Sequence, residues 1–347
     1  MKGLKMIMPQ TTSCPGNTGA PGHCPNRTGS NLIRTLKYKE LLFSIIVILS
    51  NTQVFAKDEI GFVPLFNGKD LSGWHLEEQG GFRVEEGILI TDGFGKGSDL
   101  FSENAHCNYI LRFDFMLSKV GNSGVLLRCD PEDPWSTGYE VQLLAPWTPW
   151  RDDLHCTASI YGHVPVTNRP DETTGRWYQM EIVCDRKNII ISVDGETCTI
   201  ANMDGVESLS NKNLCGAIGL QVDHAEVENQ WARFRNVRIR DLDHEPAYVV
   251  RGFQDDDARI RKQAHSSAVK IGTAMIGPLA DLMASDNPVA SNGAKRVLFD
   301  IVARISAPDV IQSQKIHLKN AIEDQIQKTQ SDITKSHLIW LLGMIEE

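Results

Sequence analysis

Polar side chains interrupt an otherwise apolar stretch in the middle of this 347-residue sequence. Glu140 and Gln142 lie two positions apart between residues 138 and 144, so on a β-strand they would share one face. Tyr139 would then point to the opposite face. A carboxylate beside an amide on an exposed strand face can bind hydroxyl groups or move a proton.

Neighbouring stretches carry further polar residues. Alternation places Arg128 on the strand face that also carries Gly124, and Gln221 interrupts a later apolar run. Residues 121–124 read Gly-Asn-Ser-Gly. One polar residue on a strand is usually only exposed to solvent. Together, however, an arginine, a glutamate and two glutamines predict the concave face of a curved sheet, where lectin-type sandwiches bind sugar.

Aromatic residues gather in the segment that follows. Trp135, Trp147 and Trp150 alternate with three prolines. Aromatic rings stack on the C–H faces of sugars, but the same pattern is typical of a loop held together by its own tryptophans, and both interpretations stay open. His155 and Tyr161 come next and could reach the same cleft, although a single such residue is more often structural.

The elements that must position these residues are predicted to be short strands. No sustained helical period occurs from 62 to 242, and Asp194-Gly195 predicts a tight hairpin. Many short strands with glycine-rich turns predict a mainly β fold, an antiparallel β-sandwich or jelly roll of the concanavalin type. The candidate strands are 82–91, 109–117, 123–129, 138–144, 177–184, 188–193, 216–222 and 231–240.

The composition changes after Asp243. Alanine, leucine, isoleucine and lysine then recur at helical spacing, with breaks at Pro278, Asn287-Pro288 and Pro308. We predict one helix over 268–283 and another over 290–305, packed as an antiparallel pair. Two or three such pairs fit in the segment, which predicts a small HEAT-like helical domain.

The amino-terminal segment has the order of an export signal. A Gly/Pro/Asn/Thr-rich stretch is followed by Lys37-Tyr38-Lys39, by an apolar run over 41–49, and by Val54-Phe55-Ala56. This order predicts a signal peptide cleaved after Ala56 and an exported protein, periplasmic or in the cell envelope. An uncleaved membrane anchor is the weaker alternative, because the run is short for a membrane span. The predicted organisation is 1–36 as a disordered extension, 37–56 as signal peptide or anchor, 60–243 as the sandwich and 250–347 as the helical domain.

Charge and cysteine content exclude some classes of protein. The formal net charge is -9, which leaves no basic surface for nucleic acid. Asp130, Glu132 and Asp133 crowd one turn, but beside two prolines they are more typical of a solvated loop than of a calcium site. We therefore predict no metal and no cofactor. The six cysteines after the signal form no zinc-like cluster; they are predicted to be buried small residues or, in part, disulfides of unknown pairing.

Ordered motifs across the predicted sandwich resemble the 3-keto-disaccharide hydrolase family. The resemblance covers about residues 62–242, and its motifs occur in the family's order. They are Leu65 to Trp74 (LFNGKDLSGW), Asn122-Ser123-Gly124-Val125 with Arg128, Gly138 to Gln142 (GYEVQ), Gly219-Leu220-Gln221 and Phe234 to Ile239 (FRNVRI). Where many relatives carry an aspartate-asparagine pair after the glutamate strand, this chain has Leu144-Ala145-Pro146-Trp147.

The resemblance implies a concanavalin-like fold and cleavage of glycosides that are oxidised at C3. On that basis Glu140 is predicted to be the general base and Arg128 to stabilise the developing enolate. His155 or Tyr161 is the predicted acid for the leaving oxygen. The predicted substrate-binding residues are Asn122, Ser123, Tyr139, Gln142, Gln221 and Trp147.

Two other functions fit the same residues. The concave face, its amides and its tryptophans suit a carbohydrate-binding module without catalysis. Alternatively, the sandwich is a scaffold and the helical domain recruits a protein partner. The fold alone does not decide among the three, because one sandwich hosts many functions.

Overall fold

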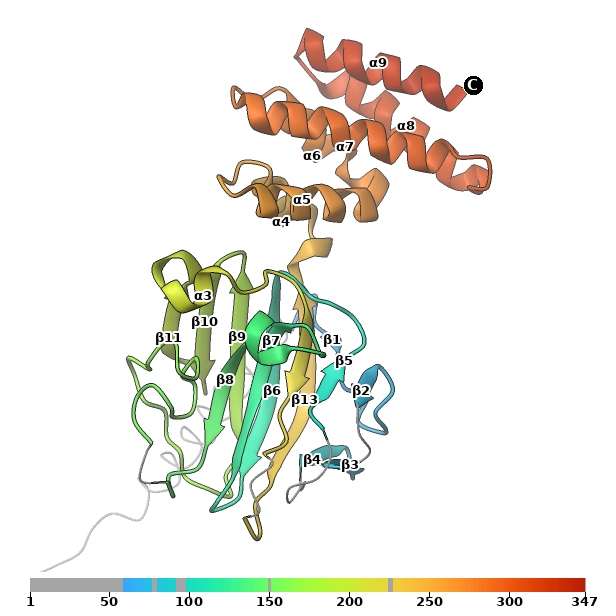
Figure 1. Cartoon of the computed structure of the whole chain (residues 1–347). Coiled ribbons are helices and arrows are strands. Elements are labelled where there is room, and N and C mark those ends of the chain that lie inside the picture. The colour runs from blue at the N-terminus through green and yellow to red at the C-terminus, as the bar shows by residue number, and fades with distance from the viewer. Residues whose placement is uncertain (1–58, 77–79, 92–97, 149–150, 224–226, 347) are drawn as a thin grey trace, which may run out of the picture. The chain divides into compact units, whose positions relative to one another are not determined.

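The computed structural model describes residues 59–346 apart from 77–79, 92–97, 149–150 and 224–226 (Figure 1). The predicted extension and signal peptide lie outside these residues, as does Trp150. Residues 61–347 form one compact unit, which is the subject below. Among the described residues no helix is both long enough and apolar enough to span a bilayer.

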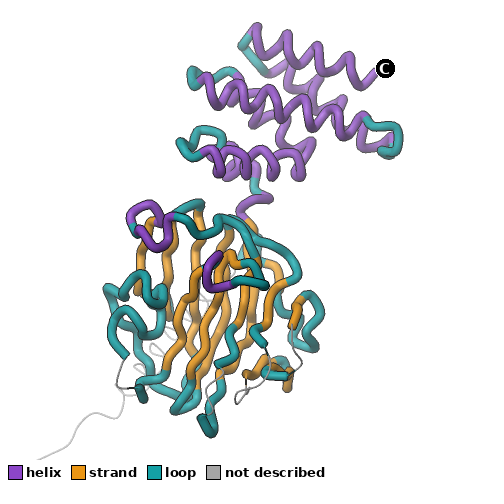
Figure 2. Tube along the Cα trace, in the orientation of Figure 1, coloured by secondary structure: helices purple, strands orange, loops and turns teal. Residues whose placement is uncertain are grey.

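Residues 63–241 form two antiparallel sheets, as predicted for a jelly-roll sandwich (Figures 1 and 2). In the described residues the larger sheet has the order β11-β10-β9-β6-β13-β4-β3, with β1 paired to β13, and the smaller has the order β2-β5-β12-β7-β8. The larger sheet contains β1 (Val63–Pro64), β3 (Phe82–Glu85), β4 (Ile88–Thr91), β6 (Tyr109–Leu117), β9 (Tyr178–Asp185), β10 (Asn188–Val193), β11 (Glu196–Asn202) and β13 (Ala232–Asp241). The smaller contains β2 (Trp74–Leu76), β5 (Leu100–Ser102), β7 (Asn122–Cys129), β8 (Tyr139–Leu144) and β12 (Ala217–Leu220).

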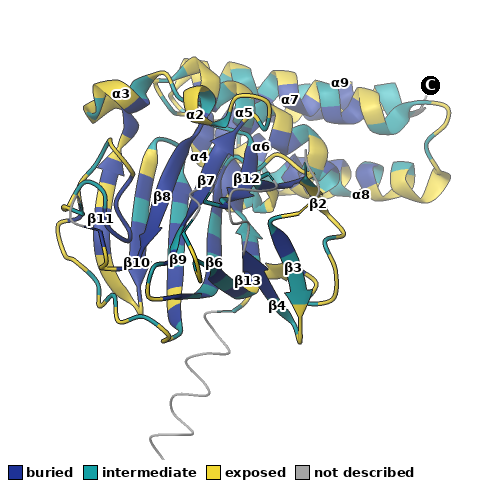
Figure 3. Cartoon of the chain, turned by 60° about the horizontal axis from the view of Figure 1, so that its bottom comes forward, coloured by how far each residue is buried: buried dark blue, intermediate teal, exposed yellow. Residues whose placement is uncertain are grey.

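The alternation of the strands builds the sandwich core. Along β6 the odd-numbered residues from Tyr109 to Leu117 are buried and the residues between them are only partly covered. In contrast, β8 is buried at every position, so it is covered on both faces (Figure 3). A layer outside the smaller sheet must therefore shield the polar face of β8.

Two corrections concern the predicted strands. The stretch 82–91 is a hairpin of β3 and β4 rather than one strand, because Glu86 and Gly87 both adopt positive φ (50° and 79°), as a type I′ turn requires. The candidate strands also omitted β11, although the predicted hairpin at Asp194-Gly195 requires a strand after the turn; β11 pairs with β10 across that turn. The short strands β1, β2 and β5 offer too few residues for alternation to reveal them.

Residues 246–346 form helices that pack in successive pairs: α4 (Pro246–Gly252) with α5 (Ala258–Ile271), α6 (Ile276–Met283) with α7 (Pro288–Ser306), and α8 (Gln312–Lys328) with α9 (Asp332–Glu346). Asn287 caps α7 by accepting from the backbone N–H groups of Val289 and Ala290. The predicted single helix over 268–283 is wrong, because Gly272 has φ 75° and ends α5 there. The structure thus shows the predicted pairing of helices, whereas the resemblance to HEAT-type repeats stays a prediction.

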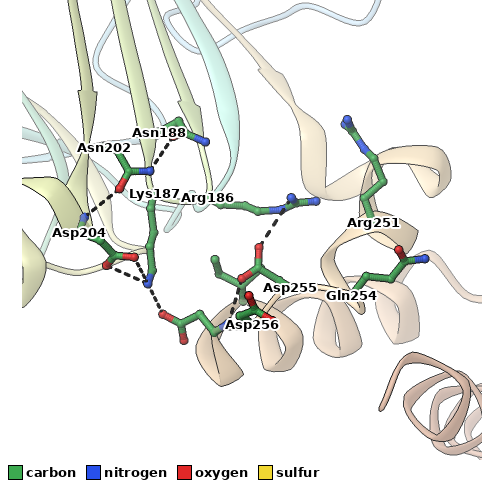
Figure 4. A pocket seen from close by; sticks show the side chains of 11 residues that line it. Arg186, Lys187, Asn188, Asn202, Asp204, Arg251, Gln254, Asp255 and Asp256 are labelled. Carbon is green, nitrogen blue, oxygen red and sulfur yellow. Dashed lines mark hydrogen bonds and ion pairs between the residues drawn. The ribbon is translucent and has the colours of Figure 1, made fainter. Parts of the chain in front are cut away.

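Ion pairs join the β9–β10 turn to the first helical pair (Figure 4). Lys187 Nζ lies 2.8 Å from Asp204 of the sandwich and 2.7 Å from Asp257, whose side chain caps α5. Tyr248 of α4 donates a 2.6 Å hydrogen bond to Asp185. These polar contacts surround an open cavity of about 510 Å³ and fix the first helices against the end of the larger sheet.

The cysteines divide between the two predicted roles. Cys107 and Cys215 form a disulfide that closes a loop with a sequence separation of 108 residues. Cys129, Cys156, Cys184 and Cys198 are buried thiols. The disulfide links the segment before β6 to the segment before β12, and so ties one sheet to the other.

Replacing Lys187 with Met should loosen the junction without unfolding the sandwich. The change keeps most of the aliphatic stem but removes the charge that bridges Asp204 and Asp257, at a cost of about 1 kcal/mol. Hydrogen exchange should accelerate in α4 and α5 and stay unchanged in β6. Lys335→Met, an exposed change on α9, is the matched control. Unaltered exchange in α4 and α5 would show that the ion pairs do not hold the junction.

Candidate active site

Glu140 lies on the outer side of the smaller sheet, opposite the core. Its neighbour Tyr139 points into the core and is 2% exposed, so the predicted alternation along β8 holds. Glu140 pairs with Leu126 of β7, and its side chain leans over Gly124. A Cβ at Gly124 would lie 2.6 Å from Glu140 Cδ, which is too close. Only glycine therefore leaves room for this carboxyl group against β7.

Burial governs the ionisation of Glu140. The residue is 4% exposed. Burial, followed by repulsion from the carboxylates of Asp99 and Asp223, raises the pKa of its carboxyl group from 4.5 to about 8. Glu140 is therefore mostly protonated at neutral pH and becomes an unusually strong base once it ionises.

Asp223 organises one side of the site. It accepts a 2.7 Å hydrogen bond from Asn122 Nδ2 and another from Gln230 Nε2. Nearby, Gln221 donates its backbone N–H to Gly124 O at 2.9 Å, which brings the segment after β12 alongside Glu140. Sequence analysis missed Asp223, although it stands two positions after Gln221 and alternation could have placed both on one face.

The segment 156–164 pairs with the outer edge of β8, the last strand of the smaller sheet. Gln142 and Glu140 form backbone hydrogen bonds with it, including Tyr161 N–H to Glu140 O at 2.9 Å. This pairing sets Tyr161 beside Glu140, and burial, followed by the charge of Glu140, raises the pKa of the Tyr161 hydroxyl. The edge of β8 is thereby covered.

His155 lies next to Tyr161. The two rings meet edge to face with centroids 4.9 Å apart, and His155 Nδ1 lies 2.7 Å from Asp152 Oδ1. This hydrogen bond, more than any other contact, lowers the pKa of the Asp152 carboxyl group. The predicted acids are thus neighbours, and Asp152, which sequence analysis missed, orients the histidine ring.

Arg128 does not face Glu140, and its predicted position on the face of Gly124 is wrong. The residue has φ 53°, where the pairing of β7 with β12 shifts register, so its side chain turns into the core. It is fully buried and donates to the backbone oxygens of Cys107 (2.7 Å) and Arg186 (2.6 Å). A role in stabilising an enolate at Glu140 does not fit this position.

Three predicted substrate-binding residues are not available to a ligand at this face. Tyr139 lies in the core with its hydroxyl 3.8 Å from Cys184 Sγ. Ser123 is fully buried and donates to Gln221 O. Gln142 lies on the face of Glu140, but its Oε1 accepts from the backbone of Leu143. Their burial follows from covering both faces of β7 and β8, which alternation alone does not reveal.

The described tryptophans of the predicted aromatic segment are exposed, whereas the polar residues of β7 and β8 discussed above are buried. Trp147 is 41% exposed just after β8, and Trp135 is 52% exposed in α2 (Pro134–Thr137). Among the described residues neither ring contacts another aromatic ring. Nor does the described part of the chain contain a group of three His, Cys, Asp or Glu side chains placed to hold a metal ion.

Comparison with known proteins identifies the sandwich. Residues 61–240 match the model of the 3-keto-alpha-glucoside-1,2-lyase-like domain. The chain belongs to this family. No curated protein matches the sequence.

Solved structures also resemble the chain over about half its length. Two proteins from Parabacteroides distasonis ATCC 8503, provisionally described as glycosyl hydrolases, are 22% and 23% identical, each with a TM-score of 0.46. The alignments cover 52% and 54% of this chain and 98% and 96% of theirs. The carbohydrate-binding module CBM66 from Bacillus subtilis is 16% identical, with a TM-score of 0.35, over 48% of this chain and 95% of the module.

The opening motif of the family has a structural role in this chain. Asn67 Oδ1 accepts hydrogen bonds from the backbones of Lys69 and Asp70, which closes a turn, and Trp74 Nε1 donates to Leu65 O. Trp74 itself is buried in the core. The motif therefore supports the fold.

Replacing Gly124 with Ala should displace the Glu140 carboxyl group. The added methyl meets the flexible end of a side chain rather than backbone, so the fold should persist while the carboxyl moves. A displacement of about 1 Å costs about a hundredfold in turnover. Circular dichroism and a crystal structure would check the fold and the displacement. Gly205→Ala, where a Cβ meets nothing within 4 Å, is the control. Full activity of Gly124→Ala would rule out a strict position for Glu140.

Glu140 should make the fold less stable as pH rises. Its pKa is about 8 in the fold against 4.5 in the unfolded chain, so the folded state binds more protons between these values. The free energy of unfolding contributed by this group is therefore fully present below pH 4.5 and is lost as pH rises through 8.

The isosteric variant Glu140→Gln has no titrating group at this position, so it removes the pH-dependent contribution of Glu140 to the free energy of unfolding. It should melt above the wild type at pH 8 and together with it at pH 4. Thermal unfolding at both pH values measures the difference, and Glu132→Gln, on an exposed turn, should show none. Identical melting of Glu140→Gln and wild type at pH 8 would show that the carboxyl group is not buried in solution.

Proposed function

We propose that this protein cleaves glycosides oxidised at C3 by removing the proton at C2 and eliminating the group on C1. Family membership supports action on carbohydrate. The observation that carries the finer proposal is the buried Glu140, whose pKa of about 8 makes it a strong base. Conventional glycosidases instead work with an acid and a second carboxylate across the glycosidic bond.

The ketone makes the elimination chemically accessible. A carbonyl at C3 acidifies the C2–H bond, so Glu140 carboxylate can take that proton. The electron pair then forms the C1–C2 double bond as the C1–O bond breaks. The leaving oxygen takes a proton from an acid of the protein, and the product is an enone. In a second step the oxygen of a water molecule bonds to C1, Glu140 returns its proton to C2, and the proton released by the water goes back to the acid that protonated the leaving oxygen.

The residues beside Glu140 suit the remaining roles. Tyr161 or His155 protonates the leaving oxygen, and Asp152 holds the imidazole in one orientation. Asn122 and Gln221 bind sugar hydroxyls from the other side of the site. Trp147 is exposed near the end of β8, where an aromatic surface can stack on the substrate.

The proposal also covers the cell compartment of the protein and a protein partner of its helical region. We propose that the protein is exported, and the Cys107–Cys215 disulfide supports an oxidising compartment. The predicted signal segment lies outside the described residues. A protein partner for the helical region stays a prediction.

The deciding assay compares a 3-keto-glucoside with its unoxidised parent. Protein from Lys57 onward should release the aglycone from the keto sugar alone, with an enone intermediate visible by mass spectrometry. Binding of the unoxidised glycan with no product from either sugar would instead favour the carbohydrate-binding module.

The pH profile and one variant test Glu140 as the base. Because the carboxylate is the active form, kcat/KM should rise with pH and level off above about 8. Glu140→Gln should keep the fold and lose turnover by a thousandfold or more, roughly the contribution of a general base. Glu132→Gln should retain full activity. An active Glu140→Gln would remove Glu140 from the mechanism.

A further inference from the structure

The helical region presents a face that the proposed cleavage does not use. The helices α5, α7 and α9 contact one another in succession and form one layer, while α4, α6 and α8 form the other (Figure 1). On α7 the exposed residues recur at spacings of three and four, so they lie along one side of the helix. They are Val289, Asn292, Arg296 and Phe299. This stripe spans about 15 Å, since each helical residue advances about 1.5 Å.

A groove of about 590 Å³ lies between α5 and α7. Four basic residues line it, and among the described residues of its walls there is no aspartate or glutamate. The basic residues are Arg261, Lys262, His265 and Arg296. The chain as a whole carries a net charge of -9, so the groove differs in sign from the rest of the molecule and attracts anionic groups.

The bottom of the groove is apolar because α7 has a glycine there. A Cβ at Gly293 would lie 3.1 Å from Phe253 Cδ1, so the missing side chain leaves the phenylalanine ring against the helix, at the floor of the groove. Glycine inside a helix of 19 residues weakens that helix relative to alanine. Val289, which is 55% exposed, adds a second apolar side chain to the same groove.

Two of the four basic side chains have no partner within the described part of the chain. Lys262 and Arg296 are exposed, and neither side chain forms an ion pair or a hydrogen bond there. The other two are engaged: Arg261 donates to two backbone oxygens, and His265 Nε2 lies 2.7 Å from Asp300 Oδ2. The lysine and the arginine, on facing helices, are therefore the cations that an anionic ligand would meet.

An exposed aromatic pair continues the stripe from α7 onto α9. Phe299 and Trp340 stack with ring centroids 6.0 Å apart, although the two residues are 40% and 54% exposed. Phe299 follows Arg296 by three positions, so the pair lies beside the cationic wall of the groove. Large aromatic residues gathered on a surface are typical of a site that another molecule covers.

We infer that this face binds an acidic peptide segment of another protein, with its carboxylates in the groove and an apolar side chain on the Phe299–Trp340 pair. An extended peptide advances about 3.3 Å per residue, so about five residues span the stripe. Such a segment carries negative charge and an apolar side chain within that length, which complements both parts of the face. An anionic polysaccharide supplies only the charge. The inference is independent of the chemistry proposed at Glu140.

A display library of random short peptides tests the inference without assuming a sequence. It is panned on the full chain, with counter-selection on a double variant that carries Lys262→Gln and Arg296→Gln. The enriched peptides should contain aspartate or glutamate within about five residues of an aromatic or large aliphatic residue. Enrichment without acidic residues would overturn the inference. Binding of polygalacturonate more tightly than any selected peptide would overturn it too, in favour of an anionic polysaccharide.

Single variants then place a selected peptide on this face, with its affinity measured by fluorescence polarisation. Lys262→Gln and Arg296→Gln should each weaken binding by about threefold, as the loss of an exposed ion pair does. Trp340→Ala should weaken it by about tenfold or more, as the loss of an aromatic anchor does. The matched controls Lys319→Gln and Ile316→Ala lie on α8, in the other layer, and should bind like the wild type.

Thermal unfolding checks that each variant is folded, and all of them should cleave the 3-keto-glucoside at the wild-type rate. Failure of the inference thus leaves the proposed function standing. An equal loss of affinity in Lys319→Gln would show attraction by charge alone and overturn the inference. Unchanged binding by Arg296→Gln and Trp340→Ala would overturn it as well, because the peptide would then bind elsewhere.

Discussion

The lean of Glu140 over Gly124 is the contact on which the site depends. Burial drives the carboxyl group of Glu140 toward its protonated form, and the two aspartates nearby strengthen the effect. This arrangement needs a neighbouring strand that has no side chain at the point of contact. On the other side of β8, the segment 156–164 pairs with the strand edge and brings Tyr161 beside Glu140.

Such a site opposes stability, and the rest of the sandwich must offset it. The apolar residues of β6, β9 and β13 fill the core between the sheets, and each fully buried large side chain contributes about 2 kcal/mol. The polar residues on the outer face of the smaller sheet contribute little hydrophobic stabilisation. The protein therefore concentrates its stability between the sheets and places its reactive group outside them.

The sequence predicted much of this from alternation, and its errors have physical reasons. Alternation separated Glu140 and Gln142 from Tyr139, and the Asp194-Gly195 turn and the helix break at Asn287-Pro288 followed from local chemistry. Arg128 was misplaced because a register shift turns one residue to the other face, and nothing in the local sequence signals it. Asp99 and Asp152 stand in loops, where only the folded chain brings Asp99 near Glu140 and Asp152 to His155.

The misplaced arginine connects the two ends of β7. At one end, Gly124 makes room for Glu140. At the other, Arg128 holds the backbone of Cys107, the disulfide-bonded residue, and of Arg186, whose turn pairs with the helices. A buried guanidinium that donates to backbone oxygens of two distant segments fixes the chain rather than a ligand. One strand thus carries the site and the anchorage of the junction, so a shift of β7 at Arg128 would also move Gly124 and the carboxyl group that rests on it.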